Sequence, residues 1–264
     1  MSFIQPINKI DQNPLLYGQK TLWLKILQEN NIKIPKTAVI SHELFLKLVA
    51  TKFSFLSEFT LNPQKLIQKL PEIQNWIKTL GFKDQIWKEI YREFDKLDSP
   101  RFAFKTSLNP PFLDQLFPSL FNNRLERTSE NIRNTYQKLF SPEIVSQIIT
   151  ANKPVITSLI VQGMVYGSMA GSICLRDDKI IIEAHKTADT SKSSQYILDM
   201  RGNLLNMPRN ESQNLNHLLY PDLISGDEIA RLYLLYLKTK NLLGLYTKLV
   251  WLKNDDFCVV DLSV

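Results

Sequence analysis

Few side chains of this sequence are placed to act as nucleophiles, acid–base catalysts or metal ligands. The three histidines, His42, His185 and His217, stand in unrelated contexts: a predicted helix start and two predicted polar loops. No residue lies at a spacing from them that would support a Ser-His-Asp or Cys-His arrangement. Cys174 and Cys258 each lie in an apolar, strand-like run, which is typical of buried thiols. The sequence therefore predicts neither a catalytic triad nor a Cys/His metal centre.

Glycine is scarce, and it is the residue that lets backbone N–H groups approach phosphates closely. The chain has 8 glycines in 264 residues, whereas an average protein has about 7% glycine. An elaborate glycine-rich phosphate cradle is therefore not expected.

Length and composition indicate a folded globular protein. A chain of 264 residues can bury the core of one large domain or of two smaller lobes. Apolar residues make up 44% and charged residues 22%, a balance that excludes a disordered chain. Two cysteines are too few for a disulfide framework, which favours a reducing compartment.

The sequence does not predict export, a membrane span or nucleic-acid binding. Its first residues lack the basic stretch and apolar block of a signal peptide, and no window approaches about 20 uninterrupted apolar residues. The net charge of +6 comes from dispersed Lys and Arg residues without a basic block, so a solvated, mildly basic surface is the simpler interpretation. We therefore expect a cytoplasmic protein, with nucleic acid an improbable partner.

The first hundred residues are predicted to be mostly helical, because apolar residues recur there at helical spacing, and a strand, a loop and two further helices are expected after them. In one segment Ile86, Ile90 and Phe94 fall on the same helical face. Helices are expected at 19–30 and 41–49, from 62–63 onward, and at 73–80, 84–97, 129–140 and 141–149. A short extended segment is expected at 32–40, a strand at 101–107 and a loop at 108–127.

Strands dominate the remainder of the chain. An apolar strand is expected at 155–162, hairpins at 172–183, 195–206 and 248–260, and a helix at 227–243 ended by Gly244. This mixture of helices and antiparallel hairpins predicts an α+β, two-lobed module. We place a helix-rich lobe at 1–154 and a hairpin-rich lobe at 155–264.

Four segments carry short motifs in order along nearly the whole chain: Gly-Gln-Lys at 18–20, Phe102–Ser107, Ile160–Val165 and the closing stretches 249–251 and 257–264. Together they resemble the N-terminal ATP-grasp domain of the phosphoenolpyruvate synthase and pyruvate phosphate dikinase family. The Gly-Gln-Lys is similar to that family's opening Gly-x-Lys, and Phe102–Ser107 stands where the family has a strand ending in Arg-Ser-Ser. The segment Ile160–Val165 is close to the family's Val-Gln-x-Met-Val. The closing segments 249–251 and 257–264 resemble its Ile-Glu-Trp and Gln-x-Arg strands.

The resemblance implies that ATP lies between two lobes, with cations on its triphosphate. It assigns Lys20 to the phosphates, although a surface helix lysine is the alternative interpretation. It also assigns them Lys105, where the family has an arginine whose planar two-pronged fork is lost here.

The resemblance further implies a base site along one stretch of chain. It places Val161, Gln162, Met164 and Val165 beside the adenine, with backbone groups that read the base edge. The alternative for these residues is a buried strand that leaves the first lobe.

The resemblance leaves the Mg²⁺ ligands incomplete. Val250 stands at the family's metal-binding Glu and cannot ligate Mg²⁺, and Asp261 and Ser263 stand at its closing Gln and Arg. Asp261 is the best replacement metal ligand, because the aspartates at 255–256 have the character of turn residues. Glu183 is retained and could contact ribose or metal, or be only a strand-end carboxylate.

The segments that cover phosphates in the family are altered too. The stretch 108–127 contains no glycine, and 185–192 replaces a glycine-rich segment. We therefore favour a degenerate ATP-grasp domain with a binding, regulatory or assembly role. The alternatives are a working ATP-dependent phosphotransferase half, which hands phosphate to a small substrate or to a partner chain with a phosphohistidine or acceptor domain, and an unrelated basic interaction module.

Overall fold

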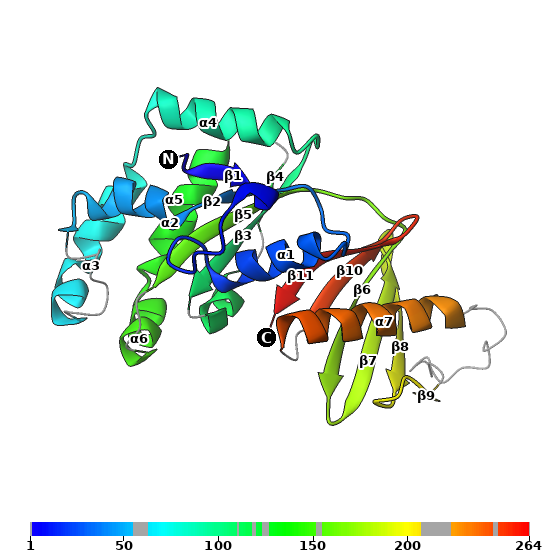
Figure 1. Ribbon diagram of the computed structural model, residues 1–264. Coiled ribbons are helices and arrows are strands. Elements are labelled where there is room, and N and C mark those ends of the chain that lie inside the picture. Colours follow the sequence, from blue (N-terminus) through cyan, green and yellow to red (C-terminus); the bar gives the residue numbers. More distant parts are fainter. Residues whose placement is uncertain are drawn as a thin grey trace. The chain divides into compact units, whose positions relative to one another are not determined.

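A computed structural model describes residues 2–54, 63–109, 111–117, 120–122, 127–151, 155–206, 223–244 and 248–263 (Figure 1). The fold is α+β, with a helix-rich N-terminal part and antiparallel hairpins in the C-terminal part, as the sequence predicts. The chain forms two compact units. Unit 1 comprises Met1–Lys25 and Lys36–Met164, and unit 2 comprises Ile26–Pro35 and Val165–Val264.

Unit 1 contains a sheet with the strand order β1-β2-β5-β3-β4. Its strands are β1 (Ile4–Pro6), β2 (Thr37–Ile40), β3 (Phe102–Asn109), β4 (Leu120–Asn122) and β5 (Ile156–Gly163). β5 is central, pairs antiparallel with both β2 and β3, and is buried along its whole length. The predicted boundary at 154/155 assigns β5 to the second lobe, whereas its strand partners and compact packing lie in unit 1.

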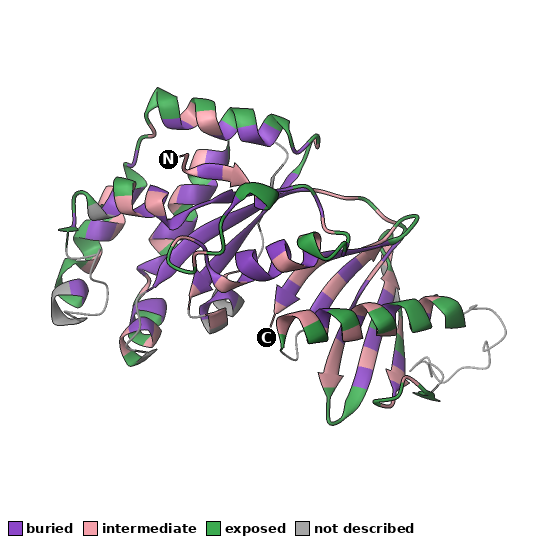
Figure 2. Ribbon diagram, in the orientation of Figure 1, coloured by how far each residue is buried: buried purple, intermediate pink, exposed green. Residues whose placement is uncertain are grey.

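The helices form around this sheet because each has an apolar stripe that strands alone cannot cover. In α4, Ile86, Ile90 and Phe94 are buried, and the Phe94 ring lies 5.3 Å from that of Phe102 and 5.9 Å from that of Phe104. Figure 2 shows the buried residues running along the strands and along the inner faces of the helices. The helices are α1 (Gln19–Glu29), α2 (His42–Phe45) continued by the π-helical turn η2 (Leu46–Ala50), α3 (Pro63–Lys78), α4 (Asp84–Asp95), α5 (Thr128–Leu139) and α6 (Pro142–Ala151).

Unit 2 contains a second antiparallel sheet with the order β11-β10-β6-β7-β8-β9. The three predicted hairpins are confirmed. The first turns at Asp177 and Asp178, whose φ angles of 48° and 56° match a two-residue hairpin turn of the primed type. The strands are β6 (Met169–Arg176), β7 (Lys179–Lys186), β8 (Asp189–Leu198), β9 (Leu204–Asn206), β10 (Lys248–Lys253) and β11 (Phe257–Ser263).

Helix α7 (Gly226–Leu243) packs against one face of this sheet (Figure 1). Ser225 and Glu228 form a capping box at its start, and Gly244 ends it with a φ of 65°. The Tyr196 hydroxyl accepts the N–H of Ile224, just before the helix, so the α7 side of the sheet is the side of Tyr196. None of the helices that the structure describes is long and apolar enough to cross a bilayer.

Two predicted loops are wrong in part. In the 108–127 stretch, β3 continues to Asn109 and a 3-10 helix, η4 (Pro111–Leu116), follows, because the Asp114 carboxylate accepts the buried N–H of Leu108 (3.0 Å). Near His185, β7 extends to Lys186 and β8 begins at Asp189. Pairing with β8 therefore makes that segment a hairpin. His217 lies outside the described residues.

Candidate functional site

One face of the sheet in unit 1 carries a group of buried polar side chains beside the apolar Val39 and Ile160. Lys105 and Ser107 alternate along β3 with the core residues Phe104 and Leu108, so the two pairs point to opposite sides of the sheet. Ser158 lies directly opposite Ser107 on β5, which places its hydroxyl on the same face. Further along β5, Gln162 lies on the same face and pairs with Thr37 of β2, and the Gln162 side-chain amide donates to the Thr37 hydroxyl (3.4 Å). Burying this many polar groups lowers the stability of the fold unless they form hydrogen bonds or ion pairs. Such clusters are therefore candidates for binding sites.

A small hydrogen-bond network fixes the start of α1 on this polar face. The Ser158 hydroxyl accepts the Gly18 N–H (3.0 Å), and the Ser107 hydroxyl accepts the Thr21 N–H (2.8 Å). The Ser158 hydroxyl also donates to the Ser107 carbonyl (3.2 Å) and lies 3.3 Å from the Thr21 hydroxyl. A Cβ on Gly18 would sit 1.9 Å from the Ser107 carbonyl oxygen, so only glycine fits there.

The network brings the two predicted phosphate cations to one side of the sheet. Lys20 directly precedes Thr21, and Lys105 stands two residues before Ser107 on the same face of β3. Each lysine is only 8% exposed. Lys20 is thus not a surface helix lysine, and two ammonium groups in a buried region favour anions nearby.

Most of the predicted base-reading stretch has its backbone engaged already. Val161 and Gln162 lie in β5, which is hydrogen-bonded to strands on both sides. The Met164 N–H donates to the Arg101 carbonyl (2.9 Å), and the Met164 carbonyl accepts the Ser99 hydroxyl (3.3 Å). Val165, where the second segment of unit 2 begins, lies outside both the β5 ladder and these two bonds.

In unit 2 the predicted carboxylates fall in one row across the sheet. Asp261 pairs with Val250, Val250 with Ser172, and Ser172 with Glu183, so all four side chains share a face. The Ser172 hydroxyl donates to the Glu183 carboxylate (2.7 Å). The Asp261 carboxylate accepts the N–H of Leu262 (2.9 Å). Val250 lies next to Asp261 in this row and has no oxygen in its side chain.

This row does not fit one shared Mg²⁺ site. Strands in a sheet lie about 4.8 Å apart, so the Cα atoms of Asp261 and Glu183, three strands apart, are separated by about 14 Å. Carboxylate oxygens on one Mg²⁺ must each lie about 2 Å from the ion. In the part of the chain that the structure describes, no three His, Cys, Asp or Glu residues gather as metal ligands.

The same sheet face carries Cys174, opposite Ile181 and close to Glu183 and Lys248. Burial raises the pKa of the Cys174 thiol. The negative charge of Glu183 raises this pKa further, and the positive charge of Lys248 lowers it, but by less than burial raises it. The thiol stays protonated at neutral pH and is a poor nucleophile. Cys258 is buried, as predicted, whereas Cys174 is only partly so.

Sequence analysis missed Ser107, Ser158 and Thr21. Their contacts join residues that are 86 and 137 positions apart in the chain. The only local signal was the pair of hydroxyl residues next to Lys105 in the Lys-Thr-Ser segment.

Comparisons with known proteins found likeness only among solved structures. No protein-family model matches the sequence, and no curated protein matches it. D-alanine–D-alanine ligase from Bacillus anthracis, complexed with ATP, aligns with 92% of this chain and 53% of its own at 10% identity, with a TM-score of 0.42. The ATP-grasp ligase PsnB, complexed with a variant of its minimal precursor, Mg and ADP, aligns with 92% of this chain and 49% of its own at 10% identity, with a TM-score of 0.36.

The macrocyclase MdnC from Microcystis aeruginosa, bound with its precursor peptide MdnA, aligns with 92% of this chain and 51% of its own at 11% identity, with a TM-score of 0.35. The chain thus spans about half the length of these structures. Because the TM-scores and identities are low, we take no residue role from these proteins.

Proposed function

We propose that this chain is an ATP-grasp-like nucleotide-binding domain, similar to the N-terminal half of phosphoenolpyruvate synthase and pyruvate phosphate dikinase, in which metal-dependent phosphate transfer is degenerate. It acts as a binding, regulatory or assembly protein. The observation that carries the proposal is the buried polar face in unit 1, where the network at Ser107 and Ser158 holds Lys20 and Lys105 on one side of the sheet.

The two lysines suit the phosphate end of a nucleotide. An ammonium is a compact charge with three donors and no acceptor, so it pairs well with phosphate oxygens. Because both groups are only 8% exposed, their attraction to an anion is weakened less by water and salt than on an open surface.

The row in unit 2 supports loss of metal chemistry. Mg²⁺ in kinases bridges phosphate oxygens and neutralises the charge that develops during transfer. Val250 contributes no oxygen, and Asp261 and Glu183 are too far apart to hold one ion together. We therefore derive no phosphate-transfer step for this chain.

A working phosphotransferase half is the second candidate. It is favoured by the retained Glu183, whose carboxylate accepts the Ser172 hydroxyl on the face of the sheet opposite α7. In that case a partner protein would supply the missing phosphohistidine or acceptor domain, or a small substrate would accept the phosphate.

A thermal-unfolding experiment with ATP, with and without Mg²⁺, separates the candidates. ATP at about 100 times its Kd should stabilise the folded chain by about 2.7 kcal/mol. The degenerate domain gives a similar shift with and without Mg²⁺, whereas a working phosphotransferase needs Mg²⁺ for most of it.

The matched variants are Lys105→Met, which should abolish the shift, and Lys88→Met, an exposed lysine of α4, which should leave it unchanged. If saturating ATP gives no shift in the wild-type chain under either condition, nucleotide binding is excluded.

A further inference from the structure

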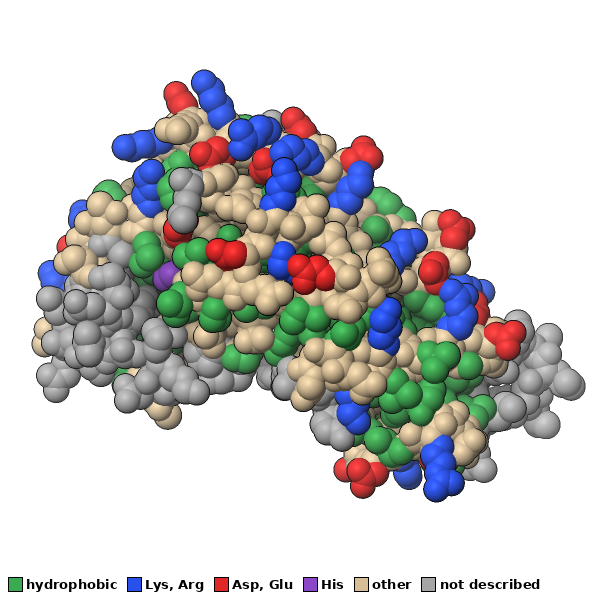
Figure 3. Space-filling model, in the orientation of Figure 1, with side chains coloured by type: hydrophobic (Ala, Val, Ile, Leu, Met, Phe, Trp, Pro, Cys, Tyr) green, Lys and Arg blue, Asp and Glu red, His purple; other side chains and the backbone are tan. Residues whose placement is uncertain are grey.

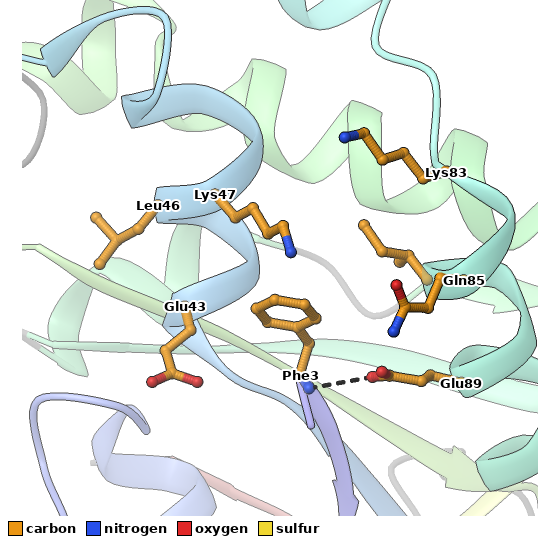
Figure 4. A pocket seen from close by; sticks show the side chains of 8 residues that line it. Phe3, Glu43, Leu46, Lys47, Lys83, Gln85 and Glu89 are labelled. Atoms are coloured by element: carbon orange, nitrogen blue, oxygen red, sulfur yellow. Dashed lines mark hydrogen bonds between the residues drawn. The ribbon is translucent and has the colours of Figure 1, made fainter. Parts of the chain in front are cut away.

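A pocket of about 440 Å³ lies in unit 1 between the α2–η2 segment and the start of α4, beside β1 (Figure 4). This volume is within the range of small-molecule sites. Phe3 forms part of its lining and packs against the hydrophobic core. Lys105 and Ser107 lie on the other side of the sheet from the core residues of β3, so the pocket is separate from the proposed nucleotide site.

Two helical segments present polar side chains to the pocket. Glu43 and Lys47 are four residues apart on α2–η2, and Gln85 and Glu89 are four residues apart on α4, so each pair lies on one side of its helix. The Glu89 carboxylate accepts the Phe3 N–H (3.3 Å), which ties the beginning of the chain to α4. The Lys47 ammonium lies 4.6 Å from the centre of the Phe3 ring.

The charges around the Phe3 ring are separated by sign. Figure 4 shows the ammonium groups of Lys47 and Lys83 on one side of the ring and the carboxylates of Glu43 and Glu89 on the other. None of these four groups forms an ion pair with another residue that the structure describes. Each of the two segments thus presents one charge of each sign to the pocket, and the opposite charges do not form ion pairs with each other.

We propose that this pocket binds a small zwitterion with an apolar side chain, such as a free amino acid of the leucine or phenylalanine type. The ligand's carboxylate is held by Lys47 and Lys83, with the Gln85 amide beside them. Its ammonium group lies toward Glu43 and Glu89, and its apolar side chain rests on Phe3.

The charge pattern excludes simpler ligands. A purely anionic ligand would be repelled by the two carboxylates and a purely cationic one by the two lysines, whereas a zwitterion complements both halves. Charge-assisted hydrogen bonds at both ends fix its orientation, and the aromatic ring supplies apolar contact area.

The proposal is tested by calorimetric titration of the full chain with three probes. L-phenylalanine carries both charges, N-acetyl-phenylalanine lacks the ammonium, and phenylalanine amide lacks the carboxylate. We expect L-phenylalanine to bind at least about tenfold more tightly than either of the other two. Equal affinities for the three probes, or no binding of L-phenylalanine at about 10 mM, would overturn the proposal.

Variants test which side chain binds each charged group of the ligand. Lys47→Met should weaken L-phenylalanine and N-acetyl-phenylalanine but leave phenylalanine amide unchanged. Glu43→Gln should weaken L-phenylalanine and phenylalanine amide but not N-acetyl-phenylalanine. Lys88→Met, on α4 but outside the pocket, serves as the control and should change nothing.

Circular dichroism checks that each variant remains folded. Loss of all binding in the Lys88→Met control, or wild-type binding in Lys47→Met and Glu43→Gln together, contradicts the assignment. The ATP experiment is independent of this one, so either proposal can fail alone.

Discussion

At the scale of single residues, small hydroxyl side chains do the positioning that the charged ones depend on. Ser107 and Ser158 hold the start of α1 against β3 and β5, because their hydroxyl oxygens accept the N–H groups of Thr21 and Gly18 that a helix start leaves unsatisfied. Lys20 directly precedes Thr21, and Lys105 lies on the same face of β3 as Ser107, so both lysines lie beside this network. A buried hydrogen bond of this kind contributes more through the cost of losing one partner than through its own strength.

His42 is a second buried polar residue with a structural task. Its Nδ1 accepts the N–H of Thr157 at the start of β5 (3.1 Å), and its ring stacks on Phe45 with centroids 5.4 Å apart. Burial lowers the pKa of His42 from 6.5 to about 4, so the ring is neutral in the folded chain at physiological pH.

We predict that the free energy of unfolding falls as the pH drops from 6.5 to about 4. Above pH 6.5 the ring is neutral in both states, and the full contribution is present. Between these pH values the unfolded chain binds a proton that folded His42 does not, which costs up to about 3 kcal/mol. Below about pH 4 His42 adds no further change.

Urea unfolding at a series of pH values measures this slope. The variant His42→Gln keeps an oxygen that can accept the Thr157 N–H but cannot titrate, so its slope in this window should be smaller. An unchanged slope in the variant would assign the pH dependence to other groups.

At the scale of elements, the start of α1 lies close to β3 because the residue at position 18 is a glycine. Gly18 lies so near the Ser107 carbonyl that any side chain would push the helix start away from β3. The carboxylate row in unit 2 is likewise a property of register. A shift of β10 by one residue against β6 would turn the Val250 side chain to the α7 side of the sheet.

We predict that Gly18→Ala destabilises the chain by about 1–3 kcal/mol, because the added methyl group must displace backbone atoms. The control is Gly81→Ala, where a Cβ would meet nothing within 4 Å and which should stay within about 0.5 kcal/mol of the wild type. Denaturant unfolding gives both values. Equal stability of the two variants would show that α1 moves away from β3 without cost.

At the scale of the whole molecule, the net charge of +6 is spread out rather than gathered. Figure 3 shows Lys and Arg side chains interspersed with Asp and Glu over the visible face. Several basic groups are also paired with acids, among them Lys36 with Asp98, Lys69 with Glu72, Lys96 with Glu93, Arg231 with Asp256 and Lys253 with Glu228.

We therefore predict weak, nonspecific binding to nucleic acid. Titration of a labelled oligonucleotide at several salt concentrations should give a slope that corresponds to no more than about two phosphate contacts. A slope that corresponds to about six or more contacts would instead favour the basic interaction module over the nucleotide-binding domain.

The sequence alone determined the elements whose signals are local. Helical spacing in α4, the turn at Asp177–Asp178 and the cap at Gly244 each depend on residues within a few positions of one another. The order of these elements also gave the α+β class. The hairpin at 185–192 was not predicted although it too is local, because its turn residues Thr187 and Ala188 are not of the Asn-Gly or Asp-Gly type that marks a two-residue hairpin turn.

Only the tertiary structure decided what the candidate sites contain. The central place of β5 in the sheet of unit 1, the network from Thr21 to Ser107 and Ser158, and the pocket that joins Phe3 to residues of α2–η2 and α4 all depend on contacts between segments far apart in the chain. The propensities of neighbouring residues cannot predict such contacts, because these contacts form only when the apolar faces of distant elements are buried together.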